Sequence, residues 1–169
     1  MIPVRTSTAV GAMGKPEGYT IRRASTDDVA TIVAHRRRMF YEMGYHDEAA
    51  LDSMSAKFQP WVLARMNSGE YFGWLVVDAE DSVVASASLW LMDWPPHMVG
   101  SGARRGYILN VYTEREFRRR GLSRRLMKLI VEWCRGNGID TVILHASSAG
   151  RQLYESLGFT ATNEMRITL

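Results

Sequence analysis

The 169 residues, 46% hydrophobic and 23% charged, are typical of one globular domain with a sizeable core and exclude the disordered and fibrous classes. One cysteine and four scattered histidines exclude an internal disulfide and argue against a metal site. Apolar runs are too short for a membrane helix or signal peptide, so we expect a cytoplasmic protein without membrane contact. Residues 104–128 hold nine of the 21 basic residues but two of the 18 acidic ones, which indicates one anionic ligand or partner.

The N-terminal half opens with a segment rich in glycine and proline that has no hydrophobic period. We expect residues 1–18 to be a mobile leader and residues 19–169 to form a single domain. Apolar and polar residues then recur with the periods of strands and helices. The expected elements are a strand over 19–23, a helix over about 25–43 capped by its first residues, and a helix over 48–67 that Pro60 could interrupt.

The C-terminal half alternates strands and helices, with glycines at the ends of helices. A segment over 93–106 contains Pro95 and Pro96 and is expected to be an irregular functional loop. The other expected elements are a hairpin of strands over 72–77 and 83–91, a buried strand over 107–112, a helix from 122 to about 135, a strand over 141–144, a helix over 149–157 and a last strand over 164–168.

The sequence Arg118-Arg119-Arg120-Gly121-Leu122-Ser123 follows the buried strand and opens a helix. The first amides of a helix have no internal partner and carry partial positive charge, so a strand, a short loop and a helix start form an anion site. Gly121 lets a ligand approach the backbone closely. Taken alone, the six residues describe a solvated basic patch equally well.

A second motif, Leu153-Tyr154-Glu155-Ser156-Leu157-Gly158-Phe159, follows one helix and one strand later, with Tyr154 33 residues after Gly121. The pair resembles the GNAT superfamily of acyl-CoA-dependent N-acyltransferases. Members of that family carry Gln/Arg-x-x-Gly-x-Gly/Ala at a helix start and, later, a sequence like Leu-Tyr-Glu-x-Leu-Gly-Phe. The resemblance covers 19–169 in element order and about 105–159 in motifs, and Ser123 replaces the second glycine or alanine.

The resemblance implies an α/β (α+β) GNAT-like fold. Its centre would be a mixed, mostly antiparallel twisted sheet, flanked by about four helices. In this family the strand that corresponds to 107–113 splays away from the one that corresponds to 141–146. The pantetheine arm of acetyl-CoA enters the gap and pairs with the exposed strand much as an added strand would.

The resemblance also implies which residues bind acetyl-CoA. Pantetheine contacts are expected from the open strand, and pyrophosphate contacts from the loop and helix start. Ser147 or Ser148 stands where many members have an asparagine that bonds the pantetheine. The full set of expected acetyl-CoA contacts is Leu109, Val111, Tyr112, Thr113, Arg118, Arg119, Arg120, Gly121, Leu122, Ser123, Arg124, Ser147 and Ser148.

Tyr154 occupies the position at which the family has a tyrosine that acts as general acid. When an amine attacks the acetyl thioester, the departing thiolate needs a proton, and a phenol with a pKa of about 10 can supply one in a desolvated site. Without the upstream motif, a packing tyrosine near a helix end would be the simpler interpretation.

The acceptor side is less defined by the sequence. Several family members use a glutamate in the strand that corresponds to 107–113 as the base that deprotonates the amine. That strand contains no glutamate here, so no general base is assignable. The remaining candidates for a base that acts through a water are His145, Glu114, Asp93 and His97. Acidic residues such as Glu42 and Glu48 could attract a cationic amine or form an ordinary solvated surface. A covalent intermediate on Cys134 is rejected, because that residue lies on the apolar face of its helix, where a thiol is inert.

The favoured hypothesis is direct transfer of acetyl from acetyl-CoA to a primary amine of a small molecule or protein. A catalytically idle, GNAT-like acyl-CoA sensor or partner module is the alternative. The basic segment could also bind nucleic acid, but only Tyr107, Tyr112 and Phe117 lie among its arginines, so we expect no nucleic acid. The family resemblance makes a homodimer possible.

Overall fold

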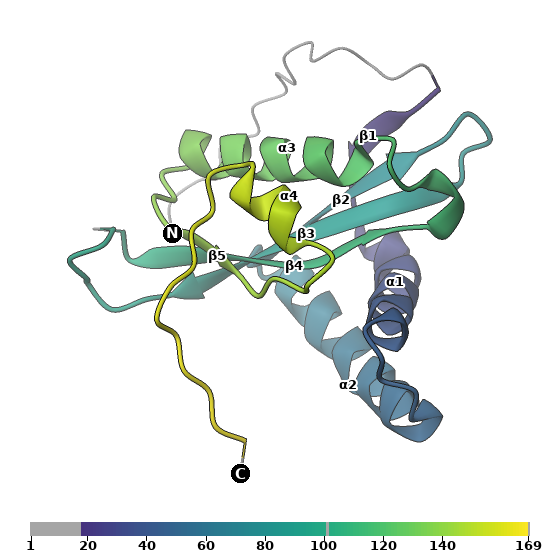
Figure 1. Cartoon of the computed structure of the whole chain (residues 1–169), viewed down its shortest axis with the longest axis horizontal. Coiled ribbons are helices and arrows are strands. Elements are labelled where there is room, and N and C mark those ends of the chain that lie inside the picture. Colours follow the sequence, from purple (N-terminus) through teal and green to yellow (C-terminus); the bar gives the residue numbers. More distant parts are fainter. Residues whose placement is uncertain (1–17, 101, 169) are drawn as a thin grey trace.

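The computed structural model describes residues 18–100 and 102–168, so the leader predicted at 1–18 falls outside them except for Gly18. Five strands form one twisted sheet in the order β1-β2-β3-β4-β5 (Figure 1). The first four pair antiparallel, and β5 lies parallel to β4. The strands are β1 (Thr20–Arg23), β2 (Tyr71–Val77), β3 (Val83–Asp93), β4 (Arg104–Thr113) and β5 (Val142–Leu144).

Four α-helices cover the sheet, with α1 and α2 on one face and α3 and α4 on the other (Figure 1). This arrangement confirms the predicted mixed, mostly antiparallel fold. The helices are α1 (Val29–Glu42), α2 (Glu48–Asn67), α3 (Leu122–Gly136) and α4 (Arg151–Glu155), and the short 3₁₀ turns are η1 (Thr26–Asp28) and η2 (Arg115–Phe117). Within the described residues, no helix is both long and apolar enough to cross a bilayer.

Local sequence explains where the first two helices begin. Ser25 and Asp28 form a capping box before α1, since each side chain accepts a bond from backbone amides that the turn leaves unpaired. The Asp47 carboxylate accepts from the amide of Ala50 at the start of α2. Pro60 does not break α2, which runs unbroken over 20 residues because Phe58 and Val62, on either side of it, are buried in the core.

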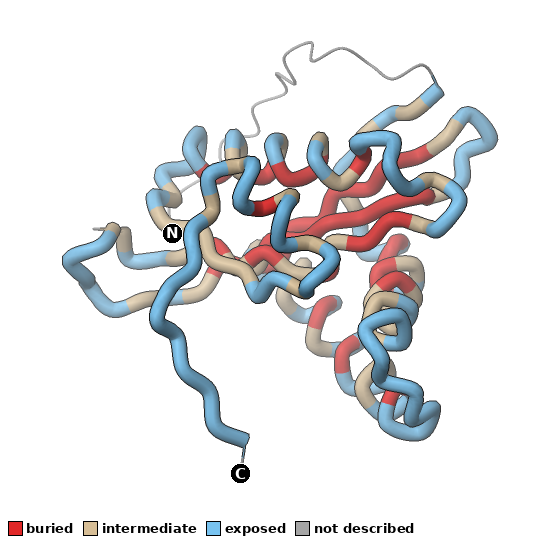
Figure 2. The backbone as a smooth tube through the Cα atoms, in the orientation of Figure 1, coloured by how far each residue is buried: buried red, intermediate tan, exposed pale blue. Residues whose placement is uncertain are grey.

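The core has two parts, one on each face of the sheet, and strands β2 and β3 between them are buried along most of their length (Figure 2). Every residue of β2 is buried. On the α3 side, Leu126, Met127 and Ile130 pack against the sheet. On the α1 and α2 side, the smaller cluster is built around Ile32, Phe58 and Val62. The sheet therefore separates two hydrophobic clusters, one under each pair of helices.

Three sequence predictions need correction. The strand predicted at 164–168 is absent: residues 160–168 are exposed, with Met165 at 94% and Ile167 at 80%, because no described strand pairs with them and alternation alone cannot hold a strand. The predicted loop over 93–106 is shorter, since β3 and β4 remain paired as far as Asp93 and Arg104. Helix α4 is five residues long, where nine were expected.

Candidate functional site

The loop before α3 has the backbone shape of an anion site. Arg119 and Gly121 adopt left-handed conformations with φ of 60° and 74°, and Gly121 is the N-cap of α3. No side chain of the described residues caps the helix; the first internal bond of α3 runs from Arg125 to the carbonyl of Gly121. The amides of Leu122, Ser123 and Arg124 therefore have no partner within the helix, which is the backbone arrangement that binds anions.

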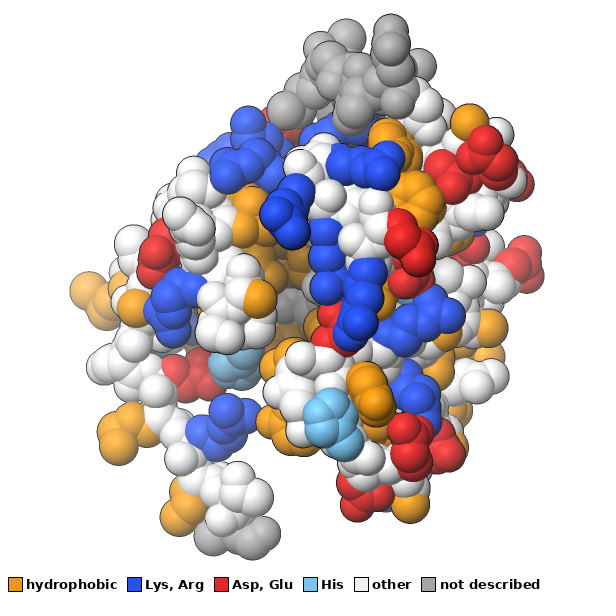
Figure 3. Space-filling model, turned by 45° about the vertical axis from the view of Figure 1, so that its right-hand side comes forward, with side chains coloured by type: hydrophobic (Ala, Val, Ile, Leu, Met, Phe, Trp, Pro, Cys, Tyr) orange, Lys and Arg blue, Asp and Glu red, His pale blue; other side chains and the backbone are white. Residues whose placement is uncertain are grey.

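The arginine side chains of the motif differ in whether they are already hydrogen-bonded within the protein. Arg118 donates to the carbonyl of Thr113 and pairs with Glu42, and Arg120 donates to the hydroxyl of Tyr19 and to the carbonyl of Glu116. Arg119 and Arg124 are exposed, and their side chains make no hydrogen bond or ion pair within the part of the chain that the structure describes. Figure 3 shows basic side chains gathered in a band down one face, beside a hollow that contains hydrophobic side chains.

Strand β4 has an open edge beside this loop. The pairing of β4 with β5 covers Gly106 to Ile108 and then stops, so Leu109, Val111, Tyr112 and Thr113 have no partner from β5. The hydroxyls of Thr113 and Ser123 lie 2.8 Å apart and join the end of β4 to the start of α3. The open edge therefore leads directly to the first amides of α3, which have no partner within the helix.

A β-bulge interrupts β4 at Asn110, a residue that the sequence analysis did not single out. Ser86 pairs with Tyr112 and Ser88 with Leu109, so β4 has one extra residue at this point. Asn110 has a φ of 55°, and its buried side chain accepts from Arg36 at 2.7 Å and donates to the Tyr71 hydroxyl at 3.0 Å. Asparagine tolerates a positive φ, but the sequence carries no pattern that marks this bulge.

Tyr154 is 9% exposed and lies on α4, packed edge-on against Phe159. Burial raises the pKa of its phenol, which keeps the proton on the oxygen, and within the described residues the hydroxyl has no hydrogen-bond partner. The ring covers Gly150 so closely that a Cβ at that position would lie 2.8 Å from Cε2 of Tyr154. A protonated, unpartnered phenol can donate to a ligand.

The two serines before α4 are not equivalent. Ser147 accepts from the amide of Gly150 through both its hydroxyl and its carbonyl, so it supports the turn that places Tyr154. Ser148 is exposed, without a hydrogen bond among the described residues, and is the freer of the two.

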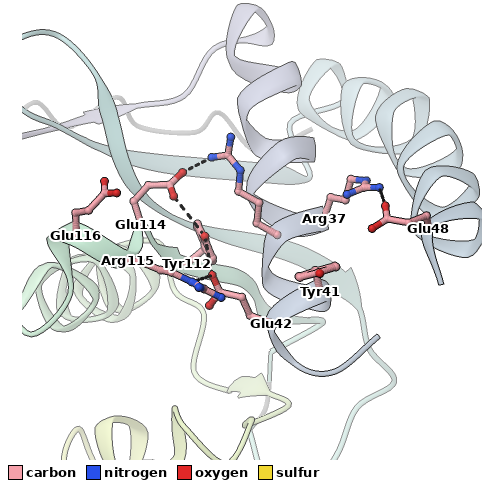
Figure 4. A pocket seen from close by; sticks show the side chains of 9 residues that line it. Arg37, Tyr41, Glu42, Glu48, Tyr112, Glu114, Arg115 and Glu116 are labelled. Carbon is pink, nitrogen blue, oxygen red and sulfur yellow. Dashed lines mark hydrogen bonds and ion pairs between the residues drawn. The ribbon is translucent and has the colours of Figure 1, made fainter. Parts of the chain in front are cut away.

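Charged groups on the α1 side form a pocket of about 420 Å³ near the end of β4 (Figure 4). Glu42 and Glu48 are already paired: Glu42 contacts Arg115 and Arg118, and Glu48 contacts Arg37. The hypothesis that these two carboxylates attract a cationic amine is therefore disfavoured. Glu116 also lines the pocket and makes no ion pair within the described residues, so the lining holds four carboxylates and three arginines.

The candidate bases named from the sequence lie in different surroundings. Glu114 contacts Arg38 and the buried His35, while the Asp93 side chain is 99% exposed and faces Arg104 at 3.8 Å. His97 accepts a bond from the amide of Val99 in the exposed β3–β4 loop. None of these three groups lies in β4 or β5 beside the open edge.

His145 differs because it comes directly after β5 and makes two hydrogen bonds. Its Nδ1 lies 2.6 Å from the hydroxyl of Tyr107 on β4, and its Nε2 lies 2.8 Å from a carboxylate oxygen of Glu164. Tyr107 and Glu164 were missed as members of a polar group because 57 residues separate them in the chain and only the fold brings them together.

Cys134 is buried on α3, as its helical position predicts. Burial raises the pKa of its thiol to about 12, which leaves almost no thiolate near neutral pH. Together with its place in the α3 core, this pKa disfavours a covalent acetyl-cysteine. Within residues 18–100 and 102–168, no three His, Cys, Asp or Glu side chains converge in a way that could hold a metal ion.

Comparison with known proteins identifies relatives of this arrangement. The model of the acetyltransferase (GNAT) family matches residues 30–159. A GCN5-related N-acetyltransferase from Ralstonia eutropha is 34% identical, with 90% of this chain and 99% of that chain covered and a TM-score of 0.85. A predicted acetyltransferase from Clostridium acetobutylicum, solved with acetyl-CoA, is 23% identical over 89% and 96% of the two chains, with a TM-score of 0.82. No curated protein matches the sequence.

Proposed function

The chain belongs to the acetyltransferase (GNAT) family, and from that premise we propose that it transfers an acetyl group from acetyl-CoA to a primary amine of a small molecule or protein. One observation carries this proposal: the open edge of β4 leads to the uncapped start of α3, and the Thr113–Ser123 contact joins them. Such a continuous backbone track suits a ligand that has an amide-bearing arm and a pyrophosphate.

The residues on this track fit acetyl-CoA. Backbone groups of Leu109, Val111 and Thr113 would pair with the pantetheine arm, and the amides of 122–124 would bind the pyrophosphate. Arg119 and Arg124 are free to contact phosphate oxygens, whereas Arg118 and Arg120 would first have to leave their present partners. Acetyl-CoA would supply the activated acetyl group as a thioester.

Tyr154 would act as general acid. The amine nitrogen forms a bond to the acetyl carbon, the carbon–sulfur bond breaks, and the departing thiolate takes the phenol proton. The nitrogen gives up a proton as the amide forms, and this proton restores the phenol. Burial supports this role, because it raises the pKa of Tyr154 and keeps the phenol protonated until the thiolate develops.

The proposal is tested by calorimetric titration with acetyl-CoA, followed by a panel of primary amines in an assay of thiol release. We expect micromolar binding and turnover of at least one amine. No binding would rule out every acyl-CoA function, and binding without turnover of any amine would favour the idle sensor. Tyr154→Phe should lower kcat about 100-fold or more with little change in acetyl-CoA affinity, since the ring remains. An unchanged kcat would remove Tyr154 from this role.

A further inference from the structure

Three side chains from separate parts of the fold form a continuous chain of hydrogen bonds. Tyr107 comes from β4, His145 from the residue that follows β5, and Glu164 from the C-terminal segment. The two contacts measure 2.6 Å, from the Tyr107 hydroxyl to Nδ1, and 2.8 Å, from Nε2 to the carboxylate. These distances are within the range of well-formed hydrogen bonds.

The order of the groups fixes the direction of the bonds when His145 is neutral. An ionised carboxylate can only accept, so Glu164 requires that Nε2 carry the hydrogen. The unprotonated Nδ1 then accepts from the Tyr107 hydroxyl. A base that is held in one tautomer by a carboxylate on its far side has the arrangement that activates hydroxyl groups in other enzymes.

The chain lies where β4 and β5 separate. Tyr107 pairs with Ile143, Ile108 pairs with Leu144 in the last register position, and His145 is the next residue. The tyrosine ring packs edge-on against Trp90, on the face that α1 and α2 cover. Tyr107 therefore stands beside the mouth of the gap, on the face opposite α3 and its loop.

Tyr107 needs His145 in order to act. Burial raises the pKa of Tyr107 and outweighs the positive charges of Arg36 and Arg166, which lower it. A phenol in this state does not ionise on its own near neutral pH, but it can take a proton on its oxygen while its own proton passes to Nδ1. The exposed His145 and Glu164 side chains can then release the proton to water.

We propose that Tyr107, His145 and Glu164 form the proton-accepting chain that converts the acceptor from an ammonium ion to a nucleophilic amine, with Tyr107 in contact with the amine. This inference rests on the proposed acetyl transfer. One N–H bond of the ammonium breaks, the proton goes to the Tyr107 oxygen, and the original phenol proton goes to His145 and then to solvent. Summed with the transfer step, an ammonium ion and acetyl-CoA give an amide, free CoA and one proton.

The chain predicts a dependence on the basicity of the acceptor. A strongly basic amine is almost entirely protonated at neutral pH and needs a base, whereas its β,β,β-trifluorinated analogue, of similar size, is largely neutral already. We would take an alkylamine that the native protein acetylates and its β,β,β-trifluorinated analogue, and measure kcat and KM for both with Tyr107→Phe, His145→Gln and Glu164→Gln.

We expect Tyr107→Phe and His145→Gln to lower kcat about 100-fold with the alkylamine and less than about tenfold with the fluorinated analogue, because general base catalysis contributes roughly that range. Glu164→Gln should show the same pattern in smaller measure, since an amide can still hold the imidazole. The control is Glu80→Gln in the β2–β3 turn, an exposed carboxylate that makes no hydrogen bond or ion pair within the described residues, and it should leave kcat with both amines unchanged.

The outcomes separate the two proposals. Equal losses with both amines, or no loss, would overturn the role of the chain and leave acetyl transfer intact, because a purely structural effect does not depend on amine basicity. Failure of the native protein to acetylate any amine would overturn acetyl transfer and the chain together. Acetyl-CoA titration of each variant shows whether it has kept its fold and its donor site.

Discussion

The glycine at position 150 leaves room for the ring of Tyr154. Gly150 lies under the ring of Tyr154, where an added Cβ would be 2.8 Å from one ring carbon and 3.2 Å from the hydroxyl oxygen. Its φ of −91° is open to any residue, so conformational freedom is not the reason for glycine here. The reason is space, because an added Cβ would require a different placement of the tyrosine.

Gly150→Ala should therefore move Tyr154 without removing it. We expect kcat to fall about tenfold or more, with a smaller change in acetyl-CoA affinity, as measured by thiol release and calorimetry. Gly136→Ala is the matched control, because a Cβ there meets nothing within 4 Å and its φ is not positive. Unchanged turnover in Gly150→Ala would mean that the tyrosine can shift without consequence.

Among the elements, β4 carries most of the site and shows what the sequence could and could not predict. Its position before the Arg118–Ser123 loop and the helix that follows it were predictable from local composition and motif spacing, whereas its role as the open strand was implied only by the family resemblance. The bulge at Asn110 was not, because its cause is tertiary: Arg36 from α1 and Tyr71 from β2 hold the side chain.

The prediction of a strand over 164–168 was also wrong for a tertiary reason. Residues 164–168 alternate polar and apolar side chains, yet a strand exists only when its backbone finds a partner, and periodicity does not reveal the partner. The contacts among Tyr107, His145 and Glu164 could not be predicted either, because these residues are far apart in the sequence. Motif spacing thus predicts a donor side, whose parts are close in sequence, but gives no prediction for an acceptor side, whose parts are not.

Replacing Asn110 tests the bulge. Asn110→Ala should lower the free energy of unfolding by about 2–4 kcal/mol, because it places alanine at positive φ and leaves Arg36 and Tyr71 without their polar partner. Asn110→Gly loses the same hydrogen bonds but tolerates the backbone, so denaturant melts should show a smaller loss. If alanine and glycine destabilise the protein equally, the positive φ stores no strain.

At the scale of the whole molecule, a buried polar contact as well as apolar packing holds α1 on the sheet. His35 of α1 is buried, with its Nδ1 2.8 Å from the hydroxyl of Ser86 on β3. Burial lowers the pKa of His35 despite the nearby Glu114 carboxylate, which acts in the opposite direction. The folded protein therefore favours the neutral ring.

This burial makes folding stability depend on pH. The unfolded chain binds a proton at His35 with an ordinary pKa near 6.5, and the folded chain does so only at lower pH, so stability is full above about 6.5 and falls as the pH drops below it. Denaturant melts at pH 7.5 and 5.5 should show this loss. Asp28 and Glu42, whose pKa values are lowered, add to the loss only at more acidic pH.

The exposed His46 provides the comparison for this pH effect. His46→Gln should reproduce the pH dependence of the native protein, because that side chain contacts only the ring of Tyr41 within the described residues. If stability stays constant between pH 7.5 and 5.5, His35 must accept a proton in the folded state without cost.

The part of β4 that β5 leaves unpaired has a consequence for the protein in a concentrated solution. Amides and carbonyls in a free strand edge are also what a strand of a second molecule would use, so the empty protein carries a nucleation point for self-association. A bound acyl-CoA would cover that edge with a molecule that cannot propagate a sheet. If the proposed donor binds there, it would protect solubility as well as supply the acetyl group, so the protein should stay soluble at higher concentration when acetyl-CoA is added.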